Sequence, residues 1–120
     1  MPEIKDKKYG KTLLLIDGNE IKDKKYGTTL FYIEGSEVKE KSKYGTVRFY
    51  LDGNEIKEKS KYGSVRYYVD GSDVKDKSKY GSLHYYIDGS EIKDKKYGNV
   101  KYYIDGALTR DQLYGFLSII

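Results

Sequence analysis

The chain is built from one short unit that repeats along most of its length. The unit has 17 or 18 residues and recurs six times between Met1 and Gly106. Its plainest copy runs from Asn54 to Gly71 and reads NEIKEKSKYGSVRYYVDG. The copies end at Gly18, Gly35, Gly53, Gly71, Gly89 and Gly106. Self-similarity at a fixed period predicts a modular architecture of stacked units, and it identifies no activity.

Each unit is predicted to form a β-hairpin. In the third copy, Val47, Phe49 and Leu51 alternate with polar or amphipathic residues, which indicates a half-buried strand. Asp52-Gly53 follows, and Asp-Gly between alternating segments is typical of a type I′ hairpin turn. With these two residues as the loop, Phe49 lies opposite Ile56. Ile56 then joins the apolar face of the first three side chains.

The second connection of each unit carries the sequence Tyr-Gly. The one-residue difference in repeat length falls here, as in 23–27 (DKKYG) against 40–45 (EKSKYG), and such variation is typical of loops. We expect the glycine to take a left-handed conformation beside a β-bulge. Six units then give an all-β fold of about twelve strands in an antiparallel meander. The alternative is a β-solenoid with one repeat per coil, which the 17-residue copies and the acidic-Gly turns disfavour.

The pattern from Tyr44-Gly45 to Asp52-Gly53, with a tyrosine between, resembles the MORN (membrane occupation and recognition nexus) repeat family. The resemblance implies tandem hairpins in a long sheet. It also implies a scaffolding role toward partner proteins or lipid surfaces. This unit is shorter than the family repeat and lacks its tryptophan, and the resemblance assigns no binding residues.

Residues 107–120 are predicted to form an amphipathic helix that caps the repeat array of residues 1–106 within one domain. Thr109 and Gln112 have the spacing of a capping box. One helical face carries Leu113, Phe116, Leu117 and Ile120. A repeat array needs such an atypical end to cover apolar surface.

The apolar face of twelve strands is too long for this helix to cover alone. Three solutions remain open: a strongly curled sheet, a barrel closed around the helix, or pairing with a second chain. The early repeats carry Leu13, Leu15 and Leu30 where later repeats carry cationic or tyrosine side chains. These leucines and the apolar helix residues are therefore candidate cap or homo-oligomer contacts.

No residues with a catalytic pattern stand out. The chain has no cysteine, which excludes disulfides and thiolate sites. His84 is the single histidine and replaces the Arg or Lys of other repeats, and the acidic residues before each terminal glycine fit turn chemistry. Phosphate loops and metal-ligand spacings are missing from the sequence. We expect a non-enzymatic protein without a cofactor or a metal.

Two surfaces are candidate binding sites. The preferred one is a Tyr/Arg-rich sheet face that would meet a protein partner, since Tyr and Arg dominate interface hot spots. It comprises Arg48, Tyr50, Arg66, Tyr68, His84, Tyr86, Lys101 and Tyr103. The less favoured one is a Lys-Tyr loop edge for a polyanion, either nucleic acid or an anionic lipid surface. It comprises Lys24, Lys25, Tyr26, Lys43, Tyr44, Lys61, Tyr62, Lys79, Tyr80, Lys96 and Tyr97.

The interleaving of Lys with Asp and Glu, and the formal net charge of +4, argue against the polyanion surface at this stage. Near-regular repeats are also compatible with a purely structural role or an engineered origin. Neither a signal peptide nor an 18-residue apolar run is present, so the cytoplasm is the default expectation.

Overall fold

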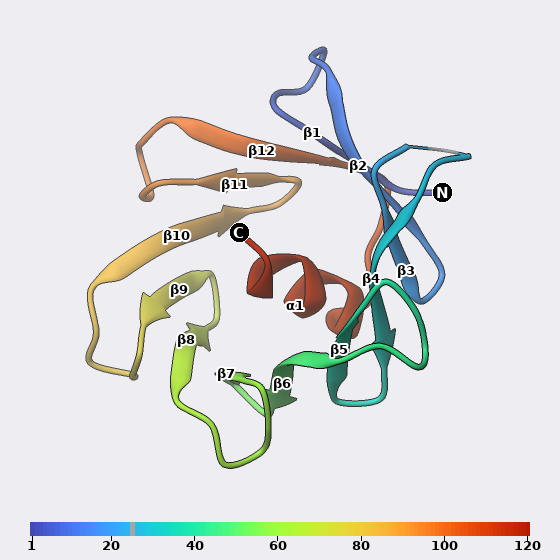
Figure 1. Ribbon diagram of the computed structural model, residues 1–120. Helices are drawn as coiled ribbons and strands as arrows, with labels where there is room; N and C mark the ends of the chain where they lie inside the picture. Colours follow the sequence, from blue (N-terminus) through green and yellow to red (C-terminus); the bar gives the residue numbers. More distant parts are fainter. Residues whose placement is uncertain (25) are drawn as a thin grey trace.

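A closed antiparallel barrel of twelve strands surrounds one short helix in the computed structural model, which describes residues 1–24 and 26–120 (Figure 1). The strands follow one another in chain order, which confirms the all-β meander of tandem hairpins. The first strands of the repeats are β1 (Glu3–Lys5), β3 (Glu20–Lys22), β5 (Glu37–Glu40), β7 (Glu55–Glu58), β9 (Asp73–Asp76) and β11 (Glu91–Lys93). The second strands are β2 (Thr12–Asp17), β4 (Thr29–Glu34), β6 (Val47–Asp52), β8 (Val65–Asp70), β10 (Leu83–Asp88) and β12 (Val100–Asp105).

The barrel closes because β1 pairs with β12, with Ile4 opposite Ile104. A contact that recurs between neighbouring repeats also bridges this seam. The Lys5 ammonium lies 3.1 Å from the Asp105 carboxylate, as Lys22 does from Asp17 inside the array. The seam thus repeats an ion pair of an ordinary junction between repeats, and the barrel alternative is the one observed.

The molecule is a shallow disc of about 39 × 37 × 17 Å. The short turns that carry the terminal glycines lie at one end of the barrel, which we call the turn end. The longer Tyr-Gly loops lie at the other end, the loop end, and spread outward to the periphery in Figure 1. Around a rim of this width, neighbouring loops of the six are about 20 Å apart along the circumference. This distance is roughly twice the spacing of two strands that a flat meander predicts.

The hairpin register differs from the sequence prediction by two residues. Leu51 lies opposite Ile56, and Phe49 lies opposite Glu58. The two loop residues are therefore Gly53-Asn54, and Gly53 takes a φ of 61° at the first loop position. A type I′ turn needs a positive φ at both loop residues, and Asn54 has none, so this loop is a type II′ turn and the predicted type I′ turn at Asp52-Gly53 is wrong. A shift of two leaves every side chain on its predicted face.

The left-handed glycine predicted for the longer loops is also wrong, whereas the bulge is present. Lys41, Lys59 and Lys77 take positive φ in the three 18-residue repeats, at 65–68°. A Cβ at Gly63 would lie 1.7 Å from the Glu58 carbonyl oxygen, so a close approach of two backbone segments requires the glycine. The register shifts between Ile56 and Lys57 on the partner strand, which places the bulge at the start of β8.

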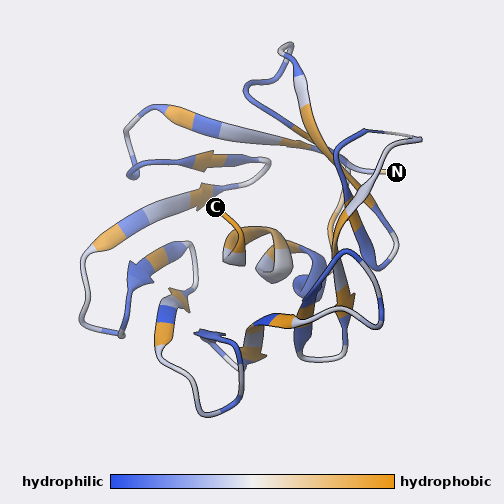
Figure 2. Cartoon of the chain, in the orientation of Figure 1, coloured by the Kyte–Doolittle hydropathy of each residue, from blue (hydrophilic) through white to orange (hydrophobic). Residues whose placement is uncertain are grey.

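The apolar faces of all repeats converge on the lumen, together with helix α1 (Arg110–Ser118). Figure 2 shows hydrophobic residues along the helix and on the strands, while the loops are largely hydrophilic. Phe116 and Leu117 are fully buried, and so are the central isoleucines and valines of the first strands. Both halves of the expected capping box are formed at Thr109 and Gln112. The helix fills the barrel from within.

Gly115 explains how the helix fits against the barrel wall. A Cβ at this position would lie 2.4 Å from Ile33 Cδ1, so a bare backbone allows α1 to approach β4. The helix N-terminus is fixed at the turn end, where Gln112 Nε2 donates to the Gly18 carbonyl at 2.9 Å. Arg110 likewise donates to the Gly53 carbonyl at 2.6 Å. The helix therefore crosses the lumen from the turn end toward the loop end.

The leucines of the first two repeats lie on the wall of the barrel that faces away from the helix or at the bulge. Leu15 is buried there, between Glu3 and Lys22 in register. Leu13 sits at a bulge and is exposed, and Leu30 is half-buried. The apolar helix residues pack in the core of their own barrel: Leu113, Phe116, Leu117 and Ile120.

Candidate functional site

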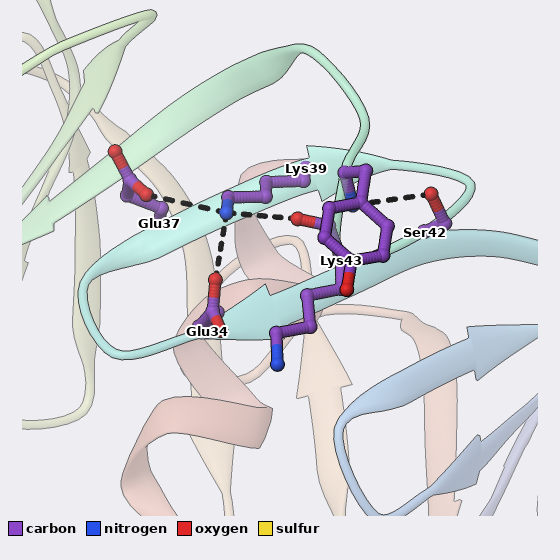
Figure 3. A network of polar contacts seen from close by, with 6 residues as sticks. Glu34, Glu37, Lys39, Ser42 and Lys43 are labelled. Carbon is purple, nitrogen blue, oxygen red and sulfur yellow. Dashed lines mark hydrogen bonds and ion pairs between the residues drawn. The ribbon is translucent and has the colours of Figure 1, made fainter.

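The outer wall of the barrel carries a belt of ion pairs that repeats around the ring. Lys39 Nζ lies 2.7 Å from Glu34 and 3.6 Å from Glu37, and it also donates to the Lys43 carbonyl at 3.0 Å (Figure 3). Lys57 has the same three partners one repeat later, namely Asp52, Glu55 and the Lys61 carbonyl. The strand lysines that lie in this belt are Lys5, Lys22, Lys39, Lys57, Lys75 and Lys93.

In two pairs of this belt the hydrogen bond shifts the pKa values of the two partners in opposite directions. The hydrogen bond with Lys57 holds the pKa of Asp52 below its ordinary value, and the same bond raises the pKa of Lys57. Lys39 and Glu34 show the same pattern. Both charges of each pair are thereby held in place at neutral pH. The lysines of this belt are therefore all paired with carboxylates of the outer wall.

The tyrosines of the preferred sheet face lie among these pairs. Tyr50 lies between Glu37 and Lys57 in register, and Tyr68 lies between Glu55 and Lys75. Tyr50, Tyr68, Tyr86 and Tyr103 are half-buried. These rings therefore pack along a charge-matched wall.

The bulges separate the cationic members of that face from its tyrosines. At each bulge two residues of the second strand oppose one residue of the first, and the extra residue is Arg48, Arg66, His84 or Lys101. A bulge redirects the side chain that it inserts. Arg48, Arg66 and His84 line pockets at the loop end beside Ile119 and Ile120. The single Tyr/Arg column expected from strict alternation is thus divided over two surfaces.

The loop end presents a ring of tyrosines, one from each repeat. Tyr9, Tyr26, Tyr44, Tyr62, Tyr80 and Tyr97 are each 90% exposed. The Lys8 ammonium lies 5.5 Å from the centre of the Tyr9 ring, and Lys96 lies 5.6 Å from that of Tyr97. In the 18-residue repeats, a serine two residues earlier accepts a hydrogen bond from the tyrosine amide, as Ser42 does from Tyr44. We call this set the tyrosine crown.

Charge that is interleaved along the sequence is segregated in space. The segments from the end of each first strand to its bulge are 6–13, 23–30, 40–48, 58–66, 76–84 and 94–101. Without Lys25, these segments hold fifteen of the other 22 Lys and Arg residues and six of the 19 Asp and Glu residues. The outer wall, the turn end and the helix hold the remaining seven Lys and Arg residues and the remaining thirteen Asp and Glu residues. The loop end is therefore strongly cationic, although the whole chain carries a formal charge of only +4.

The lysines of the loops are not neutralised locally. Over residues 1–24 and 26–120, none of the ammonium groups at positions 7, 8, 24, 41, 43, 59, 61, 77, 79, 95 and 96 pairs with a carboxylate. Their acidic neighbours are partly engaged elsewhere, because Asp6 and Asp94 accept backbone amides and Glu40 pairs with Arg48. Lys25, a member of the predicted polyanion edge, lies outside the described residues. The remaining members of that edge lie together at the loop end.

Two tyrosines in the lumen are shielded from water. Burial raises the pKa of both Tyr67 and Tyr85 above the ordinary tyrosine value. Above about pH 10 the unfolded chain loses phenolic protons that the folded chain keeps, so the folded state is destabilised as pH rises. The lumen should therefore contribute to alkaline unfolding.

These raised pKa values predict a late component in the phenol titration of the folded protein. Absorbance near the phenolate band should show this component at a higher pH than a denatured sample of the same chain does. Tyr85→Phe should reduce the late component, because partial burial raises the pKa of the Tyr85 phenol. A titration curve of the folded protein that coincides with that of the denatured chain would contradict the shielding of these rings.

The described residues contain no cluster of three or more His, Asp or Glu side chains that could hold a metal ion. The helix of the described chain is too short and too polar to span a membrane. The chain matches no protein-family model, and no curated protein or solved structure shows significant similarity to it. The function must therefore be argued from the surfaces themselves.

Proposed function

We propose that this protein is a non-enzymatic binding module that binds a polyanion through its loop end. The observation that supports the proposal is the segregation of charge: the belt lysines are paired on the outer wall, whereas the loop lysines outside position 25 have no carboxylate partner. Unpaired lysines around a rim bind phosphates or sulfates with release of counterions. The tyrosine crown adds exposed rings on which bases can stack.

The spacing of the crown favours a long ligand over a short one. Neighbouring crown tyrosines are separated by arcs of about 20 Å around the rim, several times the roughly 3.4 Å spacing of nucleotides along one DNA strand. Each loop therefore acts as a separate weak contact, and affinity arises from simultaneous engagement of several loops.

Binding to a labelled single-stranded oligonucleotide and to heparin, measured by anisotropy and competition, tests the proposal. The triple variant Lys43→Gln, Lys61→Gln, Lys79→Gln should reduce the slope of log K against log salt by about two between roughly 50 and 200 mM. The backbone carbonyls that these residues supply to the belt lysines are unchanged. An unchanged slope would contradict the proposal.

Two triple tyrosine variants distinguish binding at the loop end from binding at the outer wall. Tyr44→Ser, Tyr62→Ser, Tyr80→Ser removes half of the crown and should weaken oligonucleotide binding about tenfold or more, with a smaller effect on heparin. Tyr50→Ser, Tyr68→Ser, Tyr86→Ser changes as many rings on the outer wall and serves as the matched control. Loss of binding in the control alone would place the ligand on the outer wall.

A protein partner on the outer wall is the second candidate. Its support is the column of half-buried tyrosines at Tyr50, Tyr68, Tyr86 and Tyr103. Binding there would depend weakly on salt, because the charges of that wall are already paired.

A further inference from the structure

A pocket of about 610 Å³ opens at the loop end, beside the last residue of the chain. Strands β7 to β10 and the loops between them form its wall, and Ile120 forms its inner side. The polar and aromatic lining consists of Glu58, Arg66, Tyr67, Asp76, Lys77 and His84. The volume lies in the range of pockets that hold small molecules.

Arg66 differs from the equivalent residues of the two neighbouring repeats in its acidic partner. The last residue of the first strand pairs with the extra residue of the bulge in two repeats: Glu40 lies 2.6 Å from Arg48, and Asp76 lies 3.0 Å from His84. The equivalent pair would be Glu58 with Arg66, and it is not formed in this described part of the chain. Both side chains line the pocket instead.

The Arg66 guanidinium is only partly satisfied. Its Nη2 donates to the main-chain oxygen of Ile120 at 3.1 Å, and the Tyr67 hydroxyl donates to the same oxygen at 2.7 Å. Arg66 Nε is buried and has no hydrogen-bond partner. A buried donor without a partner is costly, and an arginine fork is suited to bidentate binding of a carboxylate or phosphate.

Aromatic rings lie next to this guanidinium. The Arg66 guanidinium carbon is 5.0 Å from the centre of the Tyr67 ring. The His84 ring is 5.1 Å from Tyr67 and 4.6 Å from Tyr85, measured between ring centres. The pocket therefore combines a cation, an aromatic wall and the free carboxylate of Glu58.

We propose that this pocket binds a small aromatic ligand that carries both an oxyanion and a hydrogen-bond donor. The oxyanion pairs with the part of the Arg66 guanidinium that lines the pocket, the ring packs against His84 and Tyr67, and the donor reaches the Glu58 carboxylate. The Asp76 carboxylate lies 3.0 Å from His84 Nδ1, and Lys77 lines the pocket as a second cation. An aromatic amino acid and a nucleotide with an amino base share this chemistry. The site lies within the loop end, because Arg66 and Lys77 belong to its cationic segments, but it needs a single ring and a single oxyanion where the polyanion surface needs several loops.

Titrations followed by amide chemical shifts test this pocket with defined probes. One arm of the experiment uses the amino acids phenylalanine and tryptophan, and the other uses adenosine monophosphate. Glycine and ribose 5-phosphate lack the ring, and phenethylamine and adenosine lack the oxyanion. Saturable shifts at Arg66, Tyr67 and Ile120 with one arm support the proposal and identify that source. The fragments should bind at least about tenfold more weakly. Failure of both arms at millimolar concentration overturns it.

Arg66→Gln should weaken the binding ligand about tenfold or more because it removes the charged fork. Arg48→Gln is the matched control: it occupies the same bulge position one repeat earlier and is paired with Glu40. Glu58→Gln should weaken ligands with an amino group and leave benzoate unaffected. Equal effects of the two arginine variants would overturn the proposal, and the amide spectrum of each variant reports whether it has folded.

Discussion

Phe116→Ala is expected to lower the free energy of unfolding by about 3–5 kcal/mol. Phe116 is fully buried in the lumen and lies edge-to-face against Tyr102, with ring centres 5.4 Å apart and planes at 89°. Removing its ring leaves a cavity at the centre of the barrel, where the closed wall of strands limits collapse. The midpoint of denaturant unfolding should fall without a change in slope.

Asp111→Ala is the control for this experiment, because Asp111 is an exposed residue in the first turn of the same helix. It should cost no more than about 1 kcal/mol through the helix dipole. A loss below about 1 kcal/mol for Phe116→Ala would mean that the helix does not fill the lumen.

Gly63→Ala should also be severely destabilising, by about 3 kcal/mol or more. The new Cβ would lie 1.7 Å from the Glu58 carbonyl oxygen, and the backbone on both sides would have to move. That carbonyl belongs to the end of β7, so the strain would reach the barrel wall. Thermal or denaturant unfolding of the variant gives the magnitude.

Two glycine variants make the comparison quantitative. Gly53→Ala places a Cβ in open space, so its cost is conformational and arises from the positive φ of 61°. Gly10→Ala meets the Asp6 carboxylate, which can rotate at the loss of its hydrogen bond to the Lys11 amide, about 1 kcal/mol. The loss of unfolding free energy should be larger for Gly63→Ala than for Gly10→Ala. The reverse order would contradict the loop geometry.

The alternation of side chains carried most of the fold prediction. Val47, Phe49 and Leu51 mark the lumen face, and the Asp-Gly turns mark the hairpins, so strand number and faces followed from the sequence. The register was wrong by two residues because Asp52-Gly53 and Gly53-Asn54 are both acceptable two-residue turns. Only the backbone distinguishes a type I′ from a type II′ loop here.

The closure of the barrel was open in the sequence although a signal for it exists. Each belt lysine pairs with the acid before the preceding turn, as Lys22 pairs with Asp17. In an open sheet Lys5 and Asp105 would both lack this partner, and pairing them with each other requires a ring. The pattern could be recognised only once the belt geometry was known.

The loop end was underestimated for a physical reason. Charges that alternate along a strand separate to different faces and ends of a barrel, so a sequence average hides the local field. The bulges had a second effect, because alternation places Arg66 beside Tyr68 on the outer wall. Arg66 is instead the extra residue of a bulge and its side chain reaches Ile120, so the pocket was not predicted.

The most direct test of the central claim is a disulfide across the seam between β1 and β12. The chain has no cysteine, so the double variant Glu3→Cys, Asp105→Cys contains a single pair, at positions that lie opposite each other. A closed barrel predicts an intrachain disulfide and a monomer near 13.9 kDa after oxidation without denaturation. Glu3→Cys, Asp52→Cys should remain reduced. Disulfide-linked dimers, or two free thiols in the seam variant, would contradict a barrel closed by one chain.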